Sequence, residues 1–413
     1  MLIGIDDTDS VNGMCTTYLA SLICRKLPIK SLPKLVRLNP NIPYKTRGNG
    51  AVAIECEHST VAKKIILTFV EKYSRMEDPK TNPGVVFLEK LGIKKSEQLN
   101  AFYRKAVSQL VTIEEAESLA EKTGAELHKF KNGRGIIGAL AAVGACLDDK
   151  TYELIAYRVS ENYGKKRIID CDKVFSMDSK LYPRVFDNVD RESGQIRITP
   201  HGRDPVYCGI RGENPEVVQE AWELIKPQSG IEFTQVFESN QATDAHLVKK
   251  KISEIMLYDC VILDGVVSAK PRTLAGGHVF FKLADDSGSV DCAAYEPTGG
   301  FRDVVRRLLV GDQVTVWGGV SKYPNTVNLE KINVTCLSDD LVRKTPVCCG
   351  KKMSSAGREK GLKCKLCGSR KPTEAIEYYS LPRKIVTGFY EVPPRARRHL
   401  SKPLVRMTYA QTH

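Results

Sequence analysis

The sequence predicts a multidomain α+β protein that binds a polyanion. The chain has 413 residues, and at ~100–200 residues per domain this length gives two to four domains. Hydrophobic residues make up 42% of the chain and charged residues 27%, as in proteins with ordinary folded cores. The apolar pattern changes along the chain, and the positive charge gathers at one end.

The net charge of +13 is unevenly placed. Residues 341–413 hold seventeen Lys and Arg and four Asp and Glu, whereas residues 1–340 hold forty-five of each. A neutral body with a basic end favours binding to a polyanion. For the basic run at 394–399, a disordered, solvated end is the alternative.

Membrane and secretion signals are not expected. No apolar run reaches the ~18 residues of a membrane-spanning helix, and no basic stretch precedes an apolar one at the start of the chain. We therefore expect a cytoplasmic protein without a secretory signal. Most of the thirteen cysteines are scattered singly and fit reduced core thiols.

The first 250 residues predict two mixed units. Residues 1–130 read as α/β, with strands at Leu2–Ile5 and Ala51–Ile54, and helices that dominate after residue 60. Residues 131–250 alternate strands with polar turns, and Pro215–Ile225 is predicted to be helical. This pattern indicates an α+β domain with an antiparallel sheet. A linker helix is expected at Lys249–Met256.

Residues 257–337 predict a five-stranded barrel. Strand patterns at 261–267, 278–283 and 290–295 precede a short helix at Phe301–Leu309, and two further strands follow at 314–318 and 327–332. Three strands, a helix and two strands is the order of an OB-fold barrel. Such barrels bind oligonucleotides, although the same scaffold also binds proteins.

Four clustered cysteines predict a zinc ribbon at residues 345–372. Cys348 and Cys349 are followed by glycine, and so are Cys364 and Cys367 after a gap of fourteen residues. This spacing is typical of a structural zinc site, whose metal supplies the folding energy of a segment too short to bury a core. Because Cys348 and Cys349 are adjacent, both can bind one metal only with backbone strain. Free thiols are the alternative.

Acidic residues follow the first strand directly. Asp6, Asp7 and Asp9 lie just past its end, and three carboxylates so close together repel one another unless a cation is present. Mg²⁺ prefers one or two carboxylates together with phosphate oxygens, and the end of a strand is where α/β sheets hold ligands. The alternative is a solvated turn with a capping residue.

Two further segments could hold phosphate. Thr16 and Thr17 lie in the first turn of a predicted helix, whose N-terminus attracts anions, although simple N-capping is an equal alternative. The run Lys45-Thr46-Arg47-Gly48-Asn49-Gly50 offers cations and close backbone approach. Lys131 and Arg134, beside glycines, could form a second clamp. None of these segments matches the P-loop or the kinase glycine loop.

These motifs together resemble the archaeal 2-agmatinylcytidine synthetase family, which acts on the AUA-reading isoleucine tRNA. The resemblance lies in Gly-Ile-Asp-Asp-Thr-Asp-Ser at 4–10, Gly-Met-Cys-Thr-Thr at 13–17, the run at 37–50, Gly-Arg-Gly-Ile-Ile-Gly-Ala-Leu-Ala-Ala at 133–142, and Glu-Ser-Asn-Gln-Ala-Thr-Asp-Ala-His-Leu at 238–247. It covers nearly the whole chain. It implies a kinase-like domain at 1–130, a ferredoxin-like domain at 131–250, an OB fold, a zinc ribbon and a basic tail at 373–413.

The resemblance also implies a reaction. The family attaches agmatine to C2 of the wobble cytidine in the CAU anticodon, so that AUA is decoded. The C2 oxygen is first phosphorylated, agmatine displaces it, and ATP ends as AMP and phosphates. The expected cofactors are Mg²⁺ with ATP and a structural Zn²⁺, and the expected partner is the isoleucine tRNA, contacted at the anticodon region and at the acceptor or backbone.

The resemblance assigns roles to residues of this chain. The expected catalytic residues are Asp6, Asp7, Asp9, Thr16 and Thr17, with Thr16 favoured as the phosphorylated threonine. Expected ATP or phosphate contacts are Thr8, Lys45, Arg47, Gly48, Asn49, Lys131 and Arg134. Agmatine, a guanidinium with an amine, is assigned to Tyr207, Glu238, Asn240 and Asp244. The tail residues Arg395, Arg397, Arg398 and His399 are expected to contact tRNA.

One feature departs from the family, and two other functions stay open. We expect two residues between the first pair of ribbon cysteines, but here they are adjacent, which puts the ligand set in question. A non-catalytic tRNA or single-strand-binding protein would need no acidic run. Another ATP-dependent nucleic-acid enzyme, such as a kinase or ligase, would consume ATP without agmatine.

Overall fold

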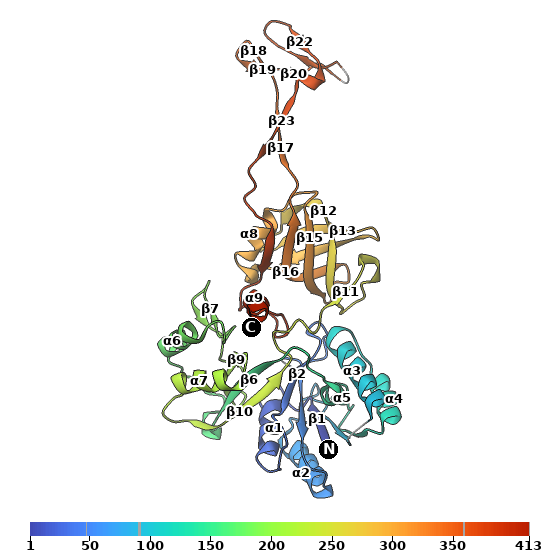
Figure 1. Ribbon diagram of the computed structural model, residues 1–413, viewed down its shortest axis with the longest axis vertical. Helices are drawn as coiled ribbons and strands as arrows, with labels where there is room; N and C mark the ends of the chain where they lie inside the picture. The colour runs from blue at the N-terminus through green and yellow to red at the C-terminus, as the bar shows by residue number, and fades with distance from the viewer. Residues whose placement is uncertain (47, 90–91, 358–359, 413) are drawn as a thin grey trace.

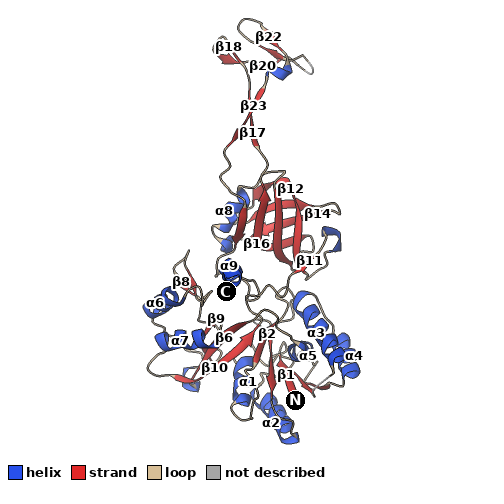
Figure 2. Ribbon diagram, viewed as in Figure 1, coloured by secondary structure: helices blue, strands red, loops and turns tan. Residues whose placement is uncertain are grey.

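The computed structural model describes residues 1–46, 48–89, 92–357 and 360–412. The molecule is elongated, with a helix-flanked sheet at one end, a barrel in the middle and a small cysteine-bearing unit at the far end of a narrow stalk (Figure 1). Helices gather around the large sheet, whereas the barrel and the far unit consist mainly of strands (Figure 2). No helix within the described ranges is long and apolar enough to span a membrane.

One sheet runs through the first two predicted domains. Its strands, in the order β5-β4-β1-β3-β2-β10-β6-β9, are β1 (Leu2–Asp6), β2 (Lys34–Arg37), β3 (Gly50–Glu55), β4 (Gly84–Leu88), β5 (Glu126–Lys129), β6 (Thr151–Arg158), β9 (Val206–Gly212) and β10 (Ile231–Ser239). The join is a short parallel pairing of β2 with β10, at Lys34–Glu238 and Leu35–Ser239. Residues 1–130 and 131–250 are therefore halves of one sheet.

Helices cover both faces of the first half. Alternate side chains of β1 and β3 pack under α1 (Thr16–Cys24) and α2 (Thr60–Tyr73). The opposite face packs against α3 (Ile93–Ser108), α4 (Ile113–Thr123) and α5 (Ile136–Gly144). α5 sits unusually close, because a Cβ on Gly4 would lie 2.0 Å from the carbonyl oxygen of Ala139. This close approach brings the start of α5 to the end of β1.

The second half is antiparallel, as predicted. β6 lies between β9 and β10 and pairs with each in the antiparallel sense. α6 (Cys171–Leu181) and α7 (Pro215–Ile225) cover one face with a core that includes Met177 and Trp222. The small hairpin of β7 (Val189–Asp190) and β8 (Gln195–Ile196) extends from this unit.

Among the described residues the barrel has the five strands predicted. They are β12 (Cys260–Thr273), β13 (Val279–Ala284), β14 (Ser289–Ala294), β15 (Gln313–Val320) and β16 (Thr326–Cys336), with α8 (Phe301–Arg306) after β14. Pairing of β12 with β15 closes the ring. The predicted linker helix at 249–256 is wrong. That segment forms β11 (Val248–Lys249) and a single turn at Ile252–Glu254, since the Ile252 amide donates to Asp285 in a barrel turn instead of to helix carbonyls.

The far unit stands on a two-stranded stalk. β17 (Asp340–Lys344) pairs with β23 (Glu377–Leu381), and between them lie five two-residue strands, at 347–348, 351–352, 354–355, 362–363 and 370–371. After the stalk the chain returns to the barrel, where β24 (Gly388–Glu391) pairs with β16. It ends in α9 (Leu404–Thr412), between the barrel and the sheet (Figure 1). The described part of 373–413 is thus folded, and the disordered-end alternative does not hold for it.

Candidate active site

The acidic run lies where the sequence predicted, at the end of β1. Asp7 has a φ of 57°, and this turn directs the carboxylates into a cavity of about 500 Å³ that Asp6, Asp7 and Asp9 all line. The Asp7 amide donates to Asp6 Oδ1 at 2.8 Å, and the Asn82 amide donates to Asp7 Oδ2 at 3.0 Å. The run is therefore a built wall of a cavity and not a solvated turn.

Burial favours the protonated forms of Asp6 and Asp7. Removal from water raises the pKa of Asp7 to about 7 and raises the pKa of Asp6 well above its usual range, with further upward contributions from the neighbouring carboxylates. Desolvation favours the neutral form of a carboxyl group, and a nearby cation favours the charged form. A divalent cation would therefore ionise this wall and be held by it.

The threonines lie at the start of α1, beside the acidic wall. Thr16 and Thr17 both line the cavity, and the Thr8 hydroxyl donates to Thr16 Oγ1 at 3.1 Å. The N-cap residue is Cys15, and within the described part of the chain no side chain caps this helix. The two threonines are thus not N-caps, and the anion-attracting helix N-terminus opens into the cavity.

Some of the residues predicted to contact phosphate lie in the same cavity. Lys45, Gly48, Asn49 and Arg134 line it, and the Arg134 guanidinium lies 3.9 Å from the centre of the Tyr44 ring. Other predicted contacts lie elsewhere: Thr8 is buried behind the wall, and the Lys131 ammonium donates to the Asp78 carbonyl. Arg47 lies outside the described residues.

A second, basic wall comes from residues that the sequence analysis did not select. Arg37, Glu153 and Arg211 line the cavity, and Glu153 lies between the arginines, 3.6 Å from Arg37 Nη2 and 3.7 Å from Arg211 Nε. Gln241 Nε2 also donates to Glu153, at 2.5 Å. In the sequence, Glu153 could have pointed to this wall, because an ionisable residue within a buried strand is rare unless it has a partner of opposite charge.

The four residues proposed to hold agmatine are not found among the described residues that line the cavity. Each has a partner inside the protein. Tyr207 donates to the Ile168 carbonyl at 2.7 Å, Glu238 accepts from Lys150 at 2.9 Å, and Asn240 pairs with the backbone of Arg37. Asp244 accepts from the Lys402 amide at 2.7 Å. The geometry gives these residues structural roles, and residues near them in sequence, such as His201 and Gly202, line the cavity instead.

The tail residues selected for tRNA contact are also engaged within the chain. Arg395 is ion-paired with Asp190 at 2.9 Å, Arg397 with Glu391 at 2.6 Å, and Arg398 with Glu330 at 3.6 Å. These carboxylates offset the arginine charges that the sequence suggested for RNA. His399 lies in the wall of the cavity.

The four ribbon cysteines converge at the end of the stalk. Their sulfur atoms all lie within 4.8 Å of one another, with Sγ–Sγ distances of 3.9 Å for Cys348–Cys349 and 3.6 Å for Cys348–Cys367. A tetrahedral zinc with bonds of about 2.3 Å places its sulfurs about 3.8 Å apart. The expected strain is present at Cys349, whose φ is 50°, and it lets adjacent cysteines face one metal. The donor set fits structural zinc.

Family models match both halves of the large sheet, the barrel and the zinc ribbon. Residues 2–132 match a family model described as the TiaS TCKD domain, and residues 133–246 match the TiaS FLD domain. Residues 261–337 match an OB-fold nucleic acid binding domain, and residues 345–385 match the TiaS C-terminal zinc ribbon domain.

Full-length relatives and solved structures agree. The chain is 49% identical to the isoleucine-tRNA 2-agmatinylcytidine synthetase TiaS of Pyrococcus horikoshii, over 98% of this chain and 96% of that protein. It resembles the crystal structure of TiaS in complex with its isoleucine tRNA and ATP, with a TM-score of 0.91 and 43% identity. It also resembles that of TiaS with the same tRNA, AMPCPP and agmatine, with a TM-score of 0.87 and 41% identity. Each structural similarity covers 98% of this chain and 97% of the other.

Proposed function

Because the chain belongs to the family of isoleucine-tRNA 2-agmatinylcytidine synthetases, we propose that it attaches agmatine to C2 of the wobble cytidine in the isoleucine tRNA with a CAU anticodon, and consumes ATP. The observation that carries this proposal is one cavity with two walls of opposite charge. Asp6, Asp7 and Asp9 form the acidic wall, and Arg37 and Arg211 contribute to the basic one.

The two walls suit phosphoryl transfer to a base. The C2 oxygen of cytidine is a poor leaving group, and phosphorylation makes it a good one. The strand-end carboxylates would hold Mg²⁺, which would offset the charge of the phosphates, and Lys45, Asn49 and Arg134 would supply further phosphate contacts. The amine of agmatine then bonds to C2 as the C2–O bond breaks, and the oxygen leaves as inorganic phosphate. ATP ends as AMP because a second phosphoryl group is lost through a phosphorylated threonine. Thr16, which lines the cavity beside the carboxylates, is the threonine that we assign to phosphorylation.

The barrel and the zinc ribbon present the tRNA to this cavity. OB barrels bind single-stranded nucleic acid, and the zinc ribbon extends far from the large sheet on its stalk (Figure 1). The wobble cytidine leaves the anticodon stack to enter the cavity, as in other base-modifying enzymes. This activity implies that the enzyme works in the cytoplasm, with its tRNA.

Mass analysis of the wobble nucleoside tests the function. The isoleucine tRNA transcript with a CAU anticodon is incubated with the protein, Mg²⁺, ATP and agmatine, and we expect agmatinylcytidine at the wobble position together with AMP. An unchanged cytidine alongside ATP consumption would refute the synthetase assignment. A transcript with uridine at the wobble position is the substrate control.

Two controls separate the other functions. Asp7→Asn should abolish product while tRNA binding persists, because the metal wall loses a ligand and the RNA surfaces lie elsewhere. A non-catalytic RNA-binding protein would give no product or ATP turnover even in the unaltered chain. A nucleic-acid kinase or ligase would modify RNA equally well when agmatine is omitted.

A further inference from the structure

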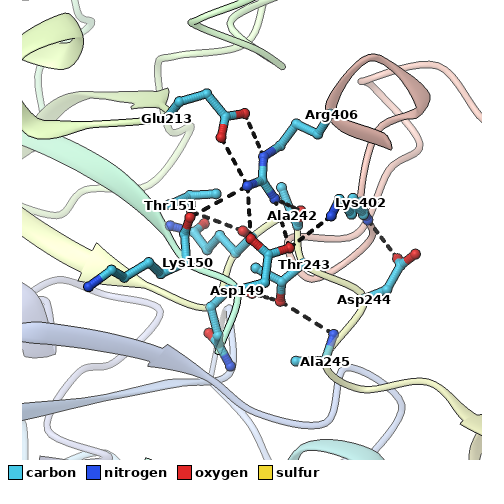
Figure 3. Close-up of polar contacts among 12 residues, drawn as sticks. Asp149, Lys150, Thr151, Glu213, Ala242, Thr243, Asp244, Ala245, Lys402 and Arg406 are labelled. Atoms are coloured by element: carbon cyan, nitrogen blue, oxygen red, sulfur yellow. Dashed lines mark hydrogen bonds and ion pairs between the residues drawn. The ribbon is translucent and has the colours of Figure 1, made fainter. Parts of the chain in front are cut away.

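The C-terminal segment crosses from the barrel to the sheet and forms part of the cavity wall. We call residues 391–406 the C-terminal strap. On the barrel side, the Val392 amide donates to the Glu330 carbonyl at 3.2 Å. On the sheet side, Arg406 is ion-paired with Glu213 at 2.6 Å and with Asp149 at 3.0 Å. Figure 3 shows the Arg406 guanidinium between these two carboxylates, with Lys402 reaching the same group of residues.

The position of His399 within the strap is fixed by backbone hydrogen bonds. The Ala242 amide donates to the His399 carbonyl at 2.7 Å, and the Asp244 amide donates to the Leu400 carbonyl at 2.8 Å. Ala242 and Asp244 have φ values of 57° and 61°. Residues other than glycine rarely adopt this backbone conformation. This tight turn directs both amides at the strap, so the backbone carbonyls of His399 and of the next residue are both held by hydrogen bonds from the sheet domain.

The His399 side chain is exposed into the cavity and contacts the basic wall. Its Nδ1 lies 2.9 Å from Arg211 Nη2. Since a guanidinium can only donate, Nδ1 is the acceptor, and the remaining ring proton of the neutral imidazole is on Nε2. The positive charge of Arg37, then desolvation, then Arg211 and Lys45 hold the pKa of His399 well below its usual range. Glu153 is the anionic group between Arg37 and Arg211.

We propose that His399 is a positioning residue of the active site, which fixes the Arg211 guanidinium in the cavity and so links the strap to the basic wall. The inference rests on the proposed function. Arg211 has one further anchor for its guanidinium among the described residues, the ion pair of its Nε with Glu153 at 3.7 Å, which is too long for a hydrogen bond. The hydrogen bond to His399 therefore sets the direction of Arg211.

Three substitutions at residue 399 separate positioning from other roles. His399→Ala removes the acceptor, and we expect kcat to fall roughly tenfold to a hundredfold, the effect of a misplaced catalytic-site group, with unchanged tRNA affinity. His399→Asn can place an amide oxygen near the position of Nδ1, so its kcat should be close to that of the unaltered protein. His399→Gln places its amide nearer the position of Nε2 and should not. Thermal unfolding of each variant checks that it folds.

A double-substitution cycle tests whether His399 acts through Arg211. If it does, His399→Ala combined with Arg211→Gln should be no slower than Arg211→Gln alone, because coupled residues are non-additive. Additive losses would overturn the inference, as would full kcat in His399→Ala or a loss confined to tRNA affinity. An inactive His399→Asn, with the pH dependence of kcat changed, would indicate proton transfer and overturn it too. If the unaltered protein makes no agmatinylcytidine, the proposed function has failed instead.

Discussion

Replacing Asp7 by Asn should stabilise the metal-free protein while it abolishes activity. The exchange suits the local structure, because Asn tolerates the φ of 57° at this position and its carbonyl oxygen can still accept from the Asn82 amide. The substitution removes the negative charge of the Asp7 carboxylate, which burial disfavours. Activity is lost because the wall no longer offers three carboxylates to a cation.

The sign and size of the effect follow from the raised pKa. The pKa of Asp7 rises from 3.8 in a model peptide to about 7 in the fold. Between about pH 4 and pH 7 the folded state thus binds more protons than the unfolded state, and the free energy of unfolding falls as the pH rises. At ~1.36 kcal/mol per pH unit, the loss above pH 7 reaches at most about 4 kcal/mol, and Asp7→Asn removes it.

Thermal unfolding of the full-length chain measures this difference. In Mg²⁺-free buffer without a chelator, so that zinc stays bound, the midpoint of Asp7→Asn should exceed that of the unaltered protein at pH 8 and match it near pH 4. Mg²⁺ should raise the midpoint of the unaltered protein at pH 8 more than that of the variant. Identical pH dependence of the two midpoints would refute the reasoning.

A neighbouring carboxylate provides the control. Asp78 is half-buried, and a hydrogen bond from the Ser10 hydroxyl at 2.7 Å holds its pKa below the usual range. Its charged form is therefore favoured by the fold, so Asp78→Asn should not raise the midpoint at pH 8.

Three other substitutions test the close packing, the metal and the strap. Alanine inside a helix usually stabilises by about 1 kcal/mol over glycine, but a Cβ on Gly138 would lie 1.9 Å from a carboxylate oxygen of the acidic wall. Gly138→Ala should lower both activity and thermal midpoint. Gly92→Ala, at the N-cap of α3, adds a Cβ that meets nothing within 4 Å among the described residues, and it should leave activity unchanged with only the small loss of stability expected for alanine at an N-cap. Cys364→Ser should lower zinc content in metal analysis and weaken tRNA binding; full zinc content would count against a four-cysteine site. Arg406→Gln leaves two carboxylates without their buried partner, and it should lower the free energy of unfolding in denaturant by about 3–5 kcal/mol. Lys226→Gln, which alters an exposed ion pair, is the control and should lower it by under about 1 kcal/mol.

Local patterns were enough for much of the fold. Several barrel strands were predicted because apolar and polar residues alternate between clear turns, as at 327–330, and α7 was predicted with its correct ends, helped by Asn214 and Pro215 at its start. β4 was missed for the opposite reason. Its five residues, Gly84–Leu88, are all buried, so the run does not alternate and lies within a stretch that is otherwise helical.

The cavity was predicted only on its local side. The carboxylates and threonines lie within twelve residues of one another in sequence, so their proximity could be foreseen. Glu153 and Arg211 reach the cavity from β6 and β9, and their meeting with Arg37 depends on the pairing of β2 with β10. The tail was read as a free basic end, since charge counts do not show that carboxylates such as Asp190 lie elsewhere in the fold to pair with it.

The short join between β2 and β10 determines how this chain could be divided. A cut near residue 130 would separate the two sequence units but expose the edges of Lys34–Arg37 and Ile231–Ser239, and unpaired strand edges recruit other chains. We therefore expect either piece alone to aggregate, and the two produced together to reassemble. The two family-model matches meet at residues 132 and 133, but the sheet continues across both of them, so each half needs the other in order to fold.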